Sequence, residues 1–153
     1  MLHSTERILV THTGSLPRPR DLIDVMLAEN EGRTFDPSDY ELKLQHAIHD
    51  IVRRQLDLGV DIVDDGEFSK RGFAVYAHQR LDGLTPTGRV RVSPWATSRE
   101  SQAFPEFYST SNPVPGNSSN PSNMQMACTG PIAYKAEKRL AQDLKNLKAA
   151  ASA

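Results

Sequence analysis

Two short stretches, THTGSLPRP at residues 11–19 and GVDIVDDGE at residues 59–67, decide the fold predicted for this chain. In each case a short apolar segment gives way to polar and glycine residues at its C-terminal end. A parallel α/β barrel places its chemistry at the carboxyl ends of its strands, because the loops that follow converge over the barrel mouth. A glycine there lets the backbone approach a ligand, and a carboxylate can bind a cation or an amine. The two stretches therefore predict a site at the mouth of a barrel.

The spacing of apolar residues around these stretches predicts three strands joined by helices. Short apolar runs favour strands, and apolar residues three or four positions apart favour helices. The expected strands are residues 8–10, 61–64 and 124–128. The expected helices are residues 20–29, 37–58, 73–81 and 137–151. Strands and helices in this order imply a parallel sheet with right-handed crossovers, and therefore the α/β class.

Two of these helices carry specific signals. Asp36 followed by Pro37 is a helix N-cap with proline at the first helical position, which predicts a helix start. In the last helix, Leu140, Leu144 and Leu147 share one stripe, whereas lysines occupy the opposite side. Such a pattern is typical of a helix that packs along one face.

The composition narrows the class of protein. The chain has 153 residues, about the size of one domain, and 38% of them are hydrophobic. Its formal net charge is −1, so it offers no positive field for a polyanion, which argues against nucleic acid as a partner. The single cysteine, Cys128, cannot form an internal disulfide, which fits a reducing compartment. No apolar run reaches membrane-spanning length. We therefore expect a cytoplasmic protein with no membrane partner.

One segment differs from the rest in composition. From residue 109 to residue 123, every residue except Val114 is Ser, Thr, Asn, Pro or Gly. Such a stretch cannot offset the entropy lost on ordering by burying apolar surface. Residues 96–123 are therefore predicted to form a flexible loop insertion.

Acidic side chains follow the second expected strand. Glu67 would lie over the barrel mouth, where a carboxylate suits a substrate ammonium group, but it could also be a solvated loop acid or pair with Lys70 or Arg71. Asp64 and Asp65 could bind a hard metal, but they lack a fixed ligand spacing. A capping or ion-pairing role is the preferred interpretation for these two residues.

The loop after the first expected strand holds further candidates. His12 could hydrogen-bond a substrate or act as a general base, because imidazole titrates near neutrality, or it could be a structural hydrogen-bonding group. Gly14 and Ser15 could contact a substrate or simply form a turn. Cys128 has no histidine or second cysteine nearby, so a small apolar role at a strand end is preferred over a zinc ligand or nucleophile.

Four basic or titratable side chains are expected at the surface without a role: Arg18, Arg20, His46 and His49. The two arginines could meet a phosphate or a polyglutamate tail, but exposed arginines beside prolines need no such explanation. The two histidines lie three positions apart on a helix that would cover the outside of the barrel.

Three motifs, taken in order, resemble the cobalamin-independent methionine synthase family, in its catalytic C-terminal barrel and its short single-barrel relatives. They are TGSLP at residues 13–17, DGEF at residues 65–68 and CTGPI at residues 128–132. The resemblance implies transfer of a methyl group from methyl-tetrahydrofolate to homocysteine, held as a thiolate on zinc. It also implies that Gly14 and Ser15 meet the carboxylate of the amino-acid substrate and that Glu67 meets its amino group.

The chain departs from that family in what it lacks. The family's zinc ligands are a His-x-Cys pair, a later Glu and a second Cys, and no counterpart is found in this sequence, so no metal ligand is assigned. A closed barrel has eight strand–helix units and typically about 250 residues. We therefore expect residues 1–153 to form a single incomplete TIM (β/α)8 barrel domain, truncated after about three units.

Several hypotheses about the function stay open. The leading hypothesis is that the chain is the N-terminal portion of a methionine-synthase-like methyltransferase. Another thiol alkyltransferase, such as an epoxide-opening enzyme, or a metal-free decarboxylase of the uroporphyrinogen type would use the same scaffold. A non-enzyme reading is an inactive fragment, or a subunit that needs a complementing C-terminal barrel piece. In isolation the chain is expected neither to retain zinc nor to turn over homocysteine, and its third strand is expected to be an unpaired edge that promotes self-association.

Overall fold

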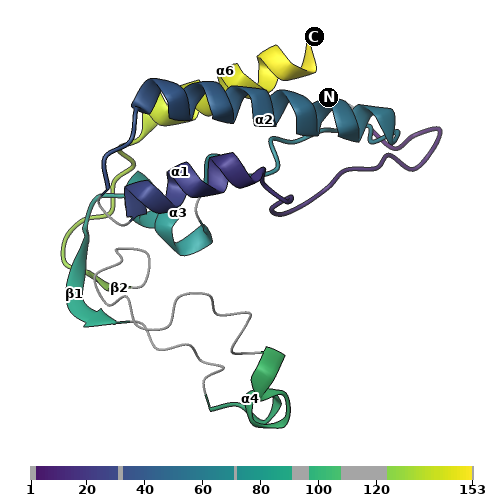
Figure 1. Ribbon diagram of the computed structural model, residues 1–153. Coiled ribbons are helices and arrows are strands. Elements are labelled where there is room, and N and C mark those ends of the chain that lie inside the picture. The colour runs from purple at the N-terminus through teal and green to yellow at the C-terminus, as the bar shows by residue number, and fades with distance from the viewer. Residues whose placement is uncertain (1–2, 31–32, 71, 91–96, 108–123, 153) are drawn as a thin grey trace.

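The structure is a computed structural model that describes residues 3–30, 33–70, 72–90, 97–107 and 124–152. Figure 1 shows α2 and α6 side by side, with α1 next to them and the two strands lying apart from this helical layer. The elements in chain order are α1 (Arg20–Asn30), α2 (Pro37–Asp57), α3 (Phe73–Arg80), β1 (Leu84–Val90), α4 (Arg99–Ala103), β2 (Met124–Cys128) and α6 (Glu137–Ala151).

The predicted helices are confirmed, with the expected start of α2. The side chain of Asp36 accepts a hydrogen bond from the backbone N–H of Ser38 at 2.8 Å, and Pro37 opens the helix. This cap satisfies one of the backbone donors that a helix start leaves unpaired. The helix ends where Gly59 takes a positive φ of 79°, a conformation that glycine adopts without steric cost.

The hydrophobic core lies between the helices and the loop after α2. Ile48 and Val52 of α2 are almost fully buried, as are Leu22 of α1 and Phe68 of the loop. The four side chains belong to one cluster, which α6 joins through Ala150. Phe68 therefore anchors its loop to the helical layer, which positions the neighbouring residue Glu67.

Helix α6 packs through a face that the sequence did not indicate. Leu140 and Leu144 are 40% and 46% exposed, whereas Asn146 and Ala150 are buried. Asn146 donates a hydrogen bond from Nδ2 to Oε1 of Glu41 on α2 at 3.0 Å. This hydrogen bond offsets the cost of burying the polar side chain. The polar contact with α2 thus fixes the orientation of α6, and part of the leucine stripe faces solvent.

The first two expected strands form only a minimal contact. Thr11 and Ile62 make an isolated parallel bridge, and the backbone N–H of Asp61 donates to the carbonyl of Val10 at 3.0 Å. The expectation of a strand at residues 8–10 is wrong: beyond this bridge no strand forms, and Ile8 and Val10 are 85% and 51% exposed. A strand buries its side chains only against covering layers, and among the described residues none covers this segment.

An ion pair fixes the same contact. Arg7 donates hydrogen bonds to both carboxylate oxygens of Asp61, and the backbone N–H of Val10 donates to Oδ2 of Asp61 at 2.9 Å. The hydrogen bond from Arg7, helped by the one from Val10, lowers the pKa of Asp61 from 3.8 to about 2. Each of these interactions favours the charged carboxylate.

The strand expected at residues 124–128 is present, and within the described residues it has a partner on one side only. The expected parallel pairing is wrong. The strand pairs antiparallel with β1, with Leu84 opposite Cys128 and Thr85 opposite Ala127. The sequence pattern missed β1 because Pro86 and Gly88 are both unfavourable within strands. The described residues therefore form a mixed α/β arrangement with one two-stranded sheet, and they do not show three successive β/α units.

Two further expectations concern the loop insertion and the membrane. Of residues 96–123, only residues 97–107 lie within the described part of the chain, and they include the short helix α4. The flexibility expected for the remainder lies outside the described residues. None of the described helices is long and apolar enough to cross a membrane.

Candidate functional site

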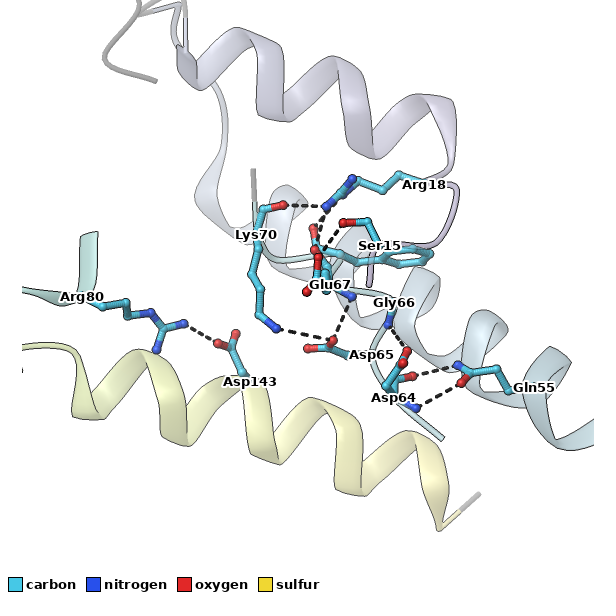
Figure 2. A network of polar contacts seen from close by, with 11 residues as sticks. Ser15, Arg18, Gln55, Asp64, Asp65, Gly66, Glu67, Lys70, Arg80 and Asp143 are labelled. Carbon is cyan, nitrogen blue, oxygen red and sulfur yellow. Dashed lines mark hydrogen bonds and ion pairs between the residues drawn. The ribbon is translucent and has the colours of Figure 1, made fainter. Parts of the chain in front are cut away.

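The structure brings together two of the predicted site residues, Ser15 and Glu67, across 52 positions of sequence. The hydroxyl of Ser15 donates a hydrogen bond to Oε2 of Glu67 at 2.5 Å, as Figure 2 shows. The backbone N–H of Leu16 donates to the carbonyl of Gly66 at 3.0 Å in the same place. The loop at residues 14–18 and the loop at residues 64–70 are therefore one joined unit.

Three residues of this unit have left-handed backbone conformations. Gly14 and Gly66 have φ values of 103° and 63°, and Glu67 has a φ of 57°. Glu67 is the one non-glycine residue with positive φ among those described. A left-handed conformation costs a residue with a Cβ roughly 1–2 kcal/mol, and such residues persist where surrounding contacts over-determine them.

The two aspartates of the second loop stabilise its backbone. Oδ1 of Asp64 accepts from the backbone N–H of Gly66 at 2.8 Å, and Oδ1 of Asp65 accepts from that of Glu67 at 2.9 Å. Gln55 of α2 exchanges two hydrogen bonds with the backbone of Asp64, at 2.8 Å and 3.1 Å (Figure 2). These contacts support the structural interpretation of both aspartates, which cap their own turn rather than the following helix.

Arg18 has a role that the sequence analysis missed. It was expected at the surface without a function, but its guanidinium is half-buried and donates to carbonyl groups of the second loop. The signal that could have found it is its place three residues after Ser15, on the loop that approaches Glu67. Arg20, in contrast, is exposed as expected and pairs with Asp24 at 3.2 Å.

His12 lies on the same segment but makes no hydrogen bond to Ser15 or Glu67 in the described structure. Its Nε2 atom is buried and has no hydrogen-bond partner among the described residues. An unpaired buried polar atom is costly unless a ligand or water satisfies it. His12 therefore keeps both of its predicted interpretations, as a ligand contact or as a structural group. Gly14 has open space where a Cβ would lie, so close packing does not explain this glycine.

The described residues do not fit a zinc centre. They contain no group of three or more His, Cys, Asp or Glu side chains that could hold a metal ion. Cys128 stands at the end of β2, but it is exposed, and its thiol donates to the carbonyl of Gly130 at 3.4 Å. Cys128 therefore ends a strand, as expected, but it is exposed to solvent and not packed among apolar side chains.

His46 and His49 lie at the surface, as expected. They line a recess of about 360 Å³ between α2 and α6, together with Lys145 and Asn146. His49 lies 3.5 Å from the exposed carboxylate of Asp50. The recess is on the helical layer and shares no lining residue with the Ser15–Glu67 contact.

These observations define a mixed α/β protein whose polar residues gather after two parallel segments. The sequence model described as "Cobalamin-independent synthase, Catalytic domain" matches residues 8–147. Because the match extends over most of the chain, this chain belongs to the cobalamin-independent synthase catalytic-domain family, whose fold is a TIM barrel. The family resemblance expected from the three motifs is confirmed.

Individual relatives agree with the family assignment. A 5-methyltetrahydropteroyltriglutamate–homocysteine methyltransferase from Lactococcus lactis is 28% identical over 87 residues, which are 57% of this chain and 11% of that protein. A methionine synthase from Sulfolobus acidocaldarius is 30% identical over 82 residues, which are 54% of this chain and 24% of that protein. The matched region thus spans about a quarter or less of these curated relatives.

A solved structure supports the fold. A B12-independent methionine synthase from a Shewanella species, in complex with selenomethionine, superposes with a TM-score of 0.52 and 18% sequence identity. The superposition covers 92% of this chain and 34% of that one. At this identity the likeness concerns the fold alone.

Proposed function

We propose that this chain supplies the amino-acid-binding loops of a methyltransferase that moves a methyl group from methyl-tetrahydrofolate to homocysteine. The observation that carries the proposal is the direct contact between Ser15 and Glu67, which joins the two loops that the family resemblance assigns to the substrate. Family membership and the names of the curated relatives support the reaction class.

In this proposal Glu67 binds the substrate's ammonium group. Ser15 occupies Oε2 of the carboxylate, and Oε1 makes no hydrogen bond within the described part of the chain. An ionised carboxylate can accept a charge-assisted hydrogen bond from an amine at either oxygen. Gly14, with open space at its Cβ position, and Ser15 would approach the substrate carboxylate.

The reaction balances once the protons are counted. The thiol of homocysteine loses its proton, its sulfur bonds to the methyl carbon while the carbon–nitrogen bond of the folate breaks, and that nitrogen takes up a proton. The described residues contain no group of three or more side chains that could hold a metal ion, and the role proposed for them is to bind and orient the amino acid.

The test compares two thiols that differ only in the amino group, homocysteine and 4-sulfanylbutanoate. A hydrogen bond to a charged group contributes roughly 1.5–3 kcal/mol, so Glu67→Gln should weaken homocysteine binding about ten- to a hundredfold. The affinity for 4-sulfanylbutanoate should not change. Ligand-detected NMR on the whole chain measures both affinities, because it registers binding in the millimolar range.

Glu6→Gln is the matched control, because Glu6 is an exposed acid that carries the same charge. It should leave both affinities unchanged. Equal losses for the two thiols in Glu67→Gln would show that Glu67 is a structural loop acid, and the proposed substrate assignment would then be wrong.

A further inference from the structure

The guanidinium of Arg18 holds the backbone that carries Glu67. Its Nη2 atom donates to the carbonyl oxygens of Glu67 at 2.7 Å and Lys70 at 2.6 Å, and its Nε atom donates to that of Phe68 at 3.4 Å. Figure 2 shows Arg18 reaching over the loop from the segment that also carries Ser15. One side chain therefore binds carbonyl groups on both sides of the turn.

The loop needs such a clamp because its backbone is strained where Glu67 lies. Gly66 and Glu67 are consecutive residues with positive φ, and a Cβ at Gly66 would lie 2.7 Å from the ring of Phe68. Glu67 has a Cβ and bears the cost of the left-handed conformation. Charged hydrogen bonds to its own carbonyl and to those of the residues that follow favour this conformation over relaxed alternatives.

The clamp also sets the register between the two loops. Ser15 donates to the carboxylate of Glu67, and Leu16 donates to the carbonyl of Gly66. Arg18 donates to the carbonyls of Glu67, Phe68 and Lys70. Contacts from three nearby positions on one segment leave the second loop little freedom to slide. The carboxylate is thereby pre-organised, which lowers the ordering cost of binding a ligand.

We propose that Arg18 is the positioning residue for Glu67 and so determines the selectivity of the site for an amino group. This inference rests on the proposed function, because it assigns Glu67 the ammonium contact. Arg18 acts through the backbone of the second loop and not on the ligand. A lysine cannot replace it, since a single ammonium lacks the planar fork that reaches several carbonyls at once.

The experiment uses Arg18→Lys and Arg18→Gln in the whole chain, with Arg20→Gln as the matched control. The first readout is the ratio of the affinities for homocysteine and 4-sulfanylbutanoate, measured by ligand-detected NMR. We expect this ratio to fall about tenfold in both Arg18 variants, since one well-placed charged hydrogen bond is lost from the ligand. A general loss of structure would weaken both thiols alike and leave the ratio unchanged.

The second readout is amide hydrogen exchange across residues 66–70, which needs no ligand. Exchange should accelerate in Arg18→Lys and Arg18→Gln while the amides of α2 keep their protection, and Arg20→Gln should match the wild type. Unchanged exchange in this loop would overturn the inference. If the wild type prefers homocysteine, an affinity ratio that stays the same in the Arg18 variants would overturn it as well. If the wild type binds the two thiols equally, the proposed function fails, and the selectivity role of Arg18 fails with it. In that case the exchange rates test only whether Arg18 holds the backbone of the loop.

Discussion

Helix α2 and the segment at residues 8–10 both carry apolar runs, but only the helix buries them. Ile48 and Val52 of α2 are 1% and 0% exposed, whereas Ile8 and Val10 are 85% and 51% exposed. A helix makes its hydrogen bonds within itself, so it needs only one packed face to be stable. A strand takes both its hydrogen bonds and its burial from neighbours distant in sequence.

This difference shows which parts of the molecule are self-sufficient. The helical layer forms a closed cluster through α1, α2, α6 and Phe68. Residues 8–11 are held by one parallel bridge and by the ion pair between Arg7 and Asp61. The candidate site lies between them: Phe68 anchors the loop of Glu67 to the core, and hydrogen bonds join this loop to residues 14–18, which follow the first segment.

The strongest test of the comparison truncates one isoleucine in each region. Ile48→Ala should lower the free energy of unfolding by about 2–5 kcal/mol, because it removes buried methyl groups and leaves a cavity. Ile8→Ala should change it by no more than about 0.5 kcal/mol, because the side chain is already in water. Urea unfolding followed by circular dichroism measures both changes. A large loss for Ile8→Ala would mean that residues 8–10 are covered in solution.

A second test asks how tightly the site loop is fixed to the core. Gly66→Ala adds a methyl group 2.7 Å from the ring of Phe68, whereas Gly59→Ala has open space and only the backbone cost of its φ of 79°. We expect Gly66→Ala to be more destabilising than Gly59→Ala by about 1–3 kcal/mol, which is the usual cost of overpacking. Thermal unfolding of the two variants gives the difference. Equal effects would show that Phe68 moves aside and that the loop is not held by the core.

The smallest expected effect concerns the ion pair that holds residues 7–10. The pKa of Asp61 is lowered from 3.8 to about 2. The stability that the ionised carboxylate of Asp61 contributes is therefore fully present above pH 3.8 and is lost as the pH falls toward about 2. Asp61→Asn should abolish this part of the pH dependence and leave the core unaffected. Melting temperatures of wild type and variant across that range give the measurement. Parallel curves for the two proteins would contradict the lowered pKa.

The helices could be predicted from the sequence because their signals are local. Asp36 and Pro37 mark the start of α2, and the spacing of its apolar residues marks the face that is buried. The family was also predictable, because TGSLP and DGEF are short motifs whose order along the chain is specific. The candidate residues Ser15 and Glu67 came from those motifs, and the structure brings the two together.

The sequence determined the helices and the motifs of the family, since each of these depends on residues close together in the chain, and it predicted Ser15 and Glu67 as candidate binding residues. The tertiary structure decided the antiparallel pairing of β1 with β2, the buried face of α6 and the role of Arg18. Each of these depends on a partner far away in sequence: β2 for β1, Glu41 for Asn146, and the carbonyls of Glu67, Phe68 and Lys70 for Arg18. Backbone carbonyls leave no mark in a sequence, because every residue has one, so only the folded chain shows which of them a side chain will bind.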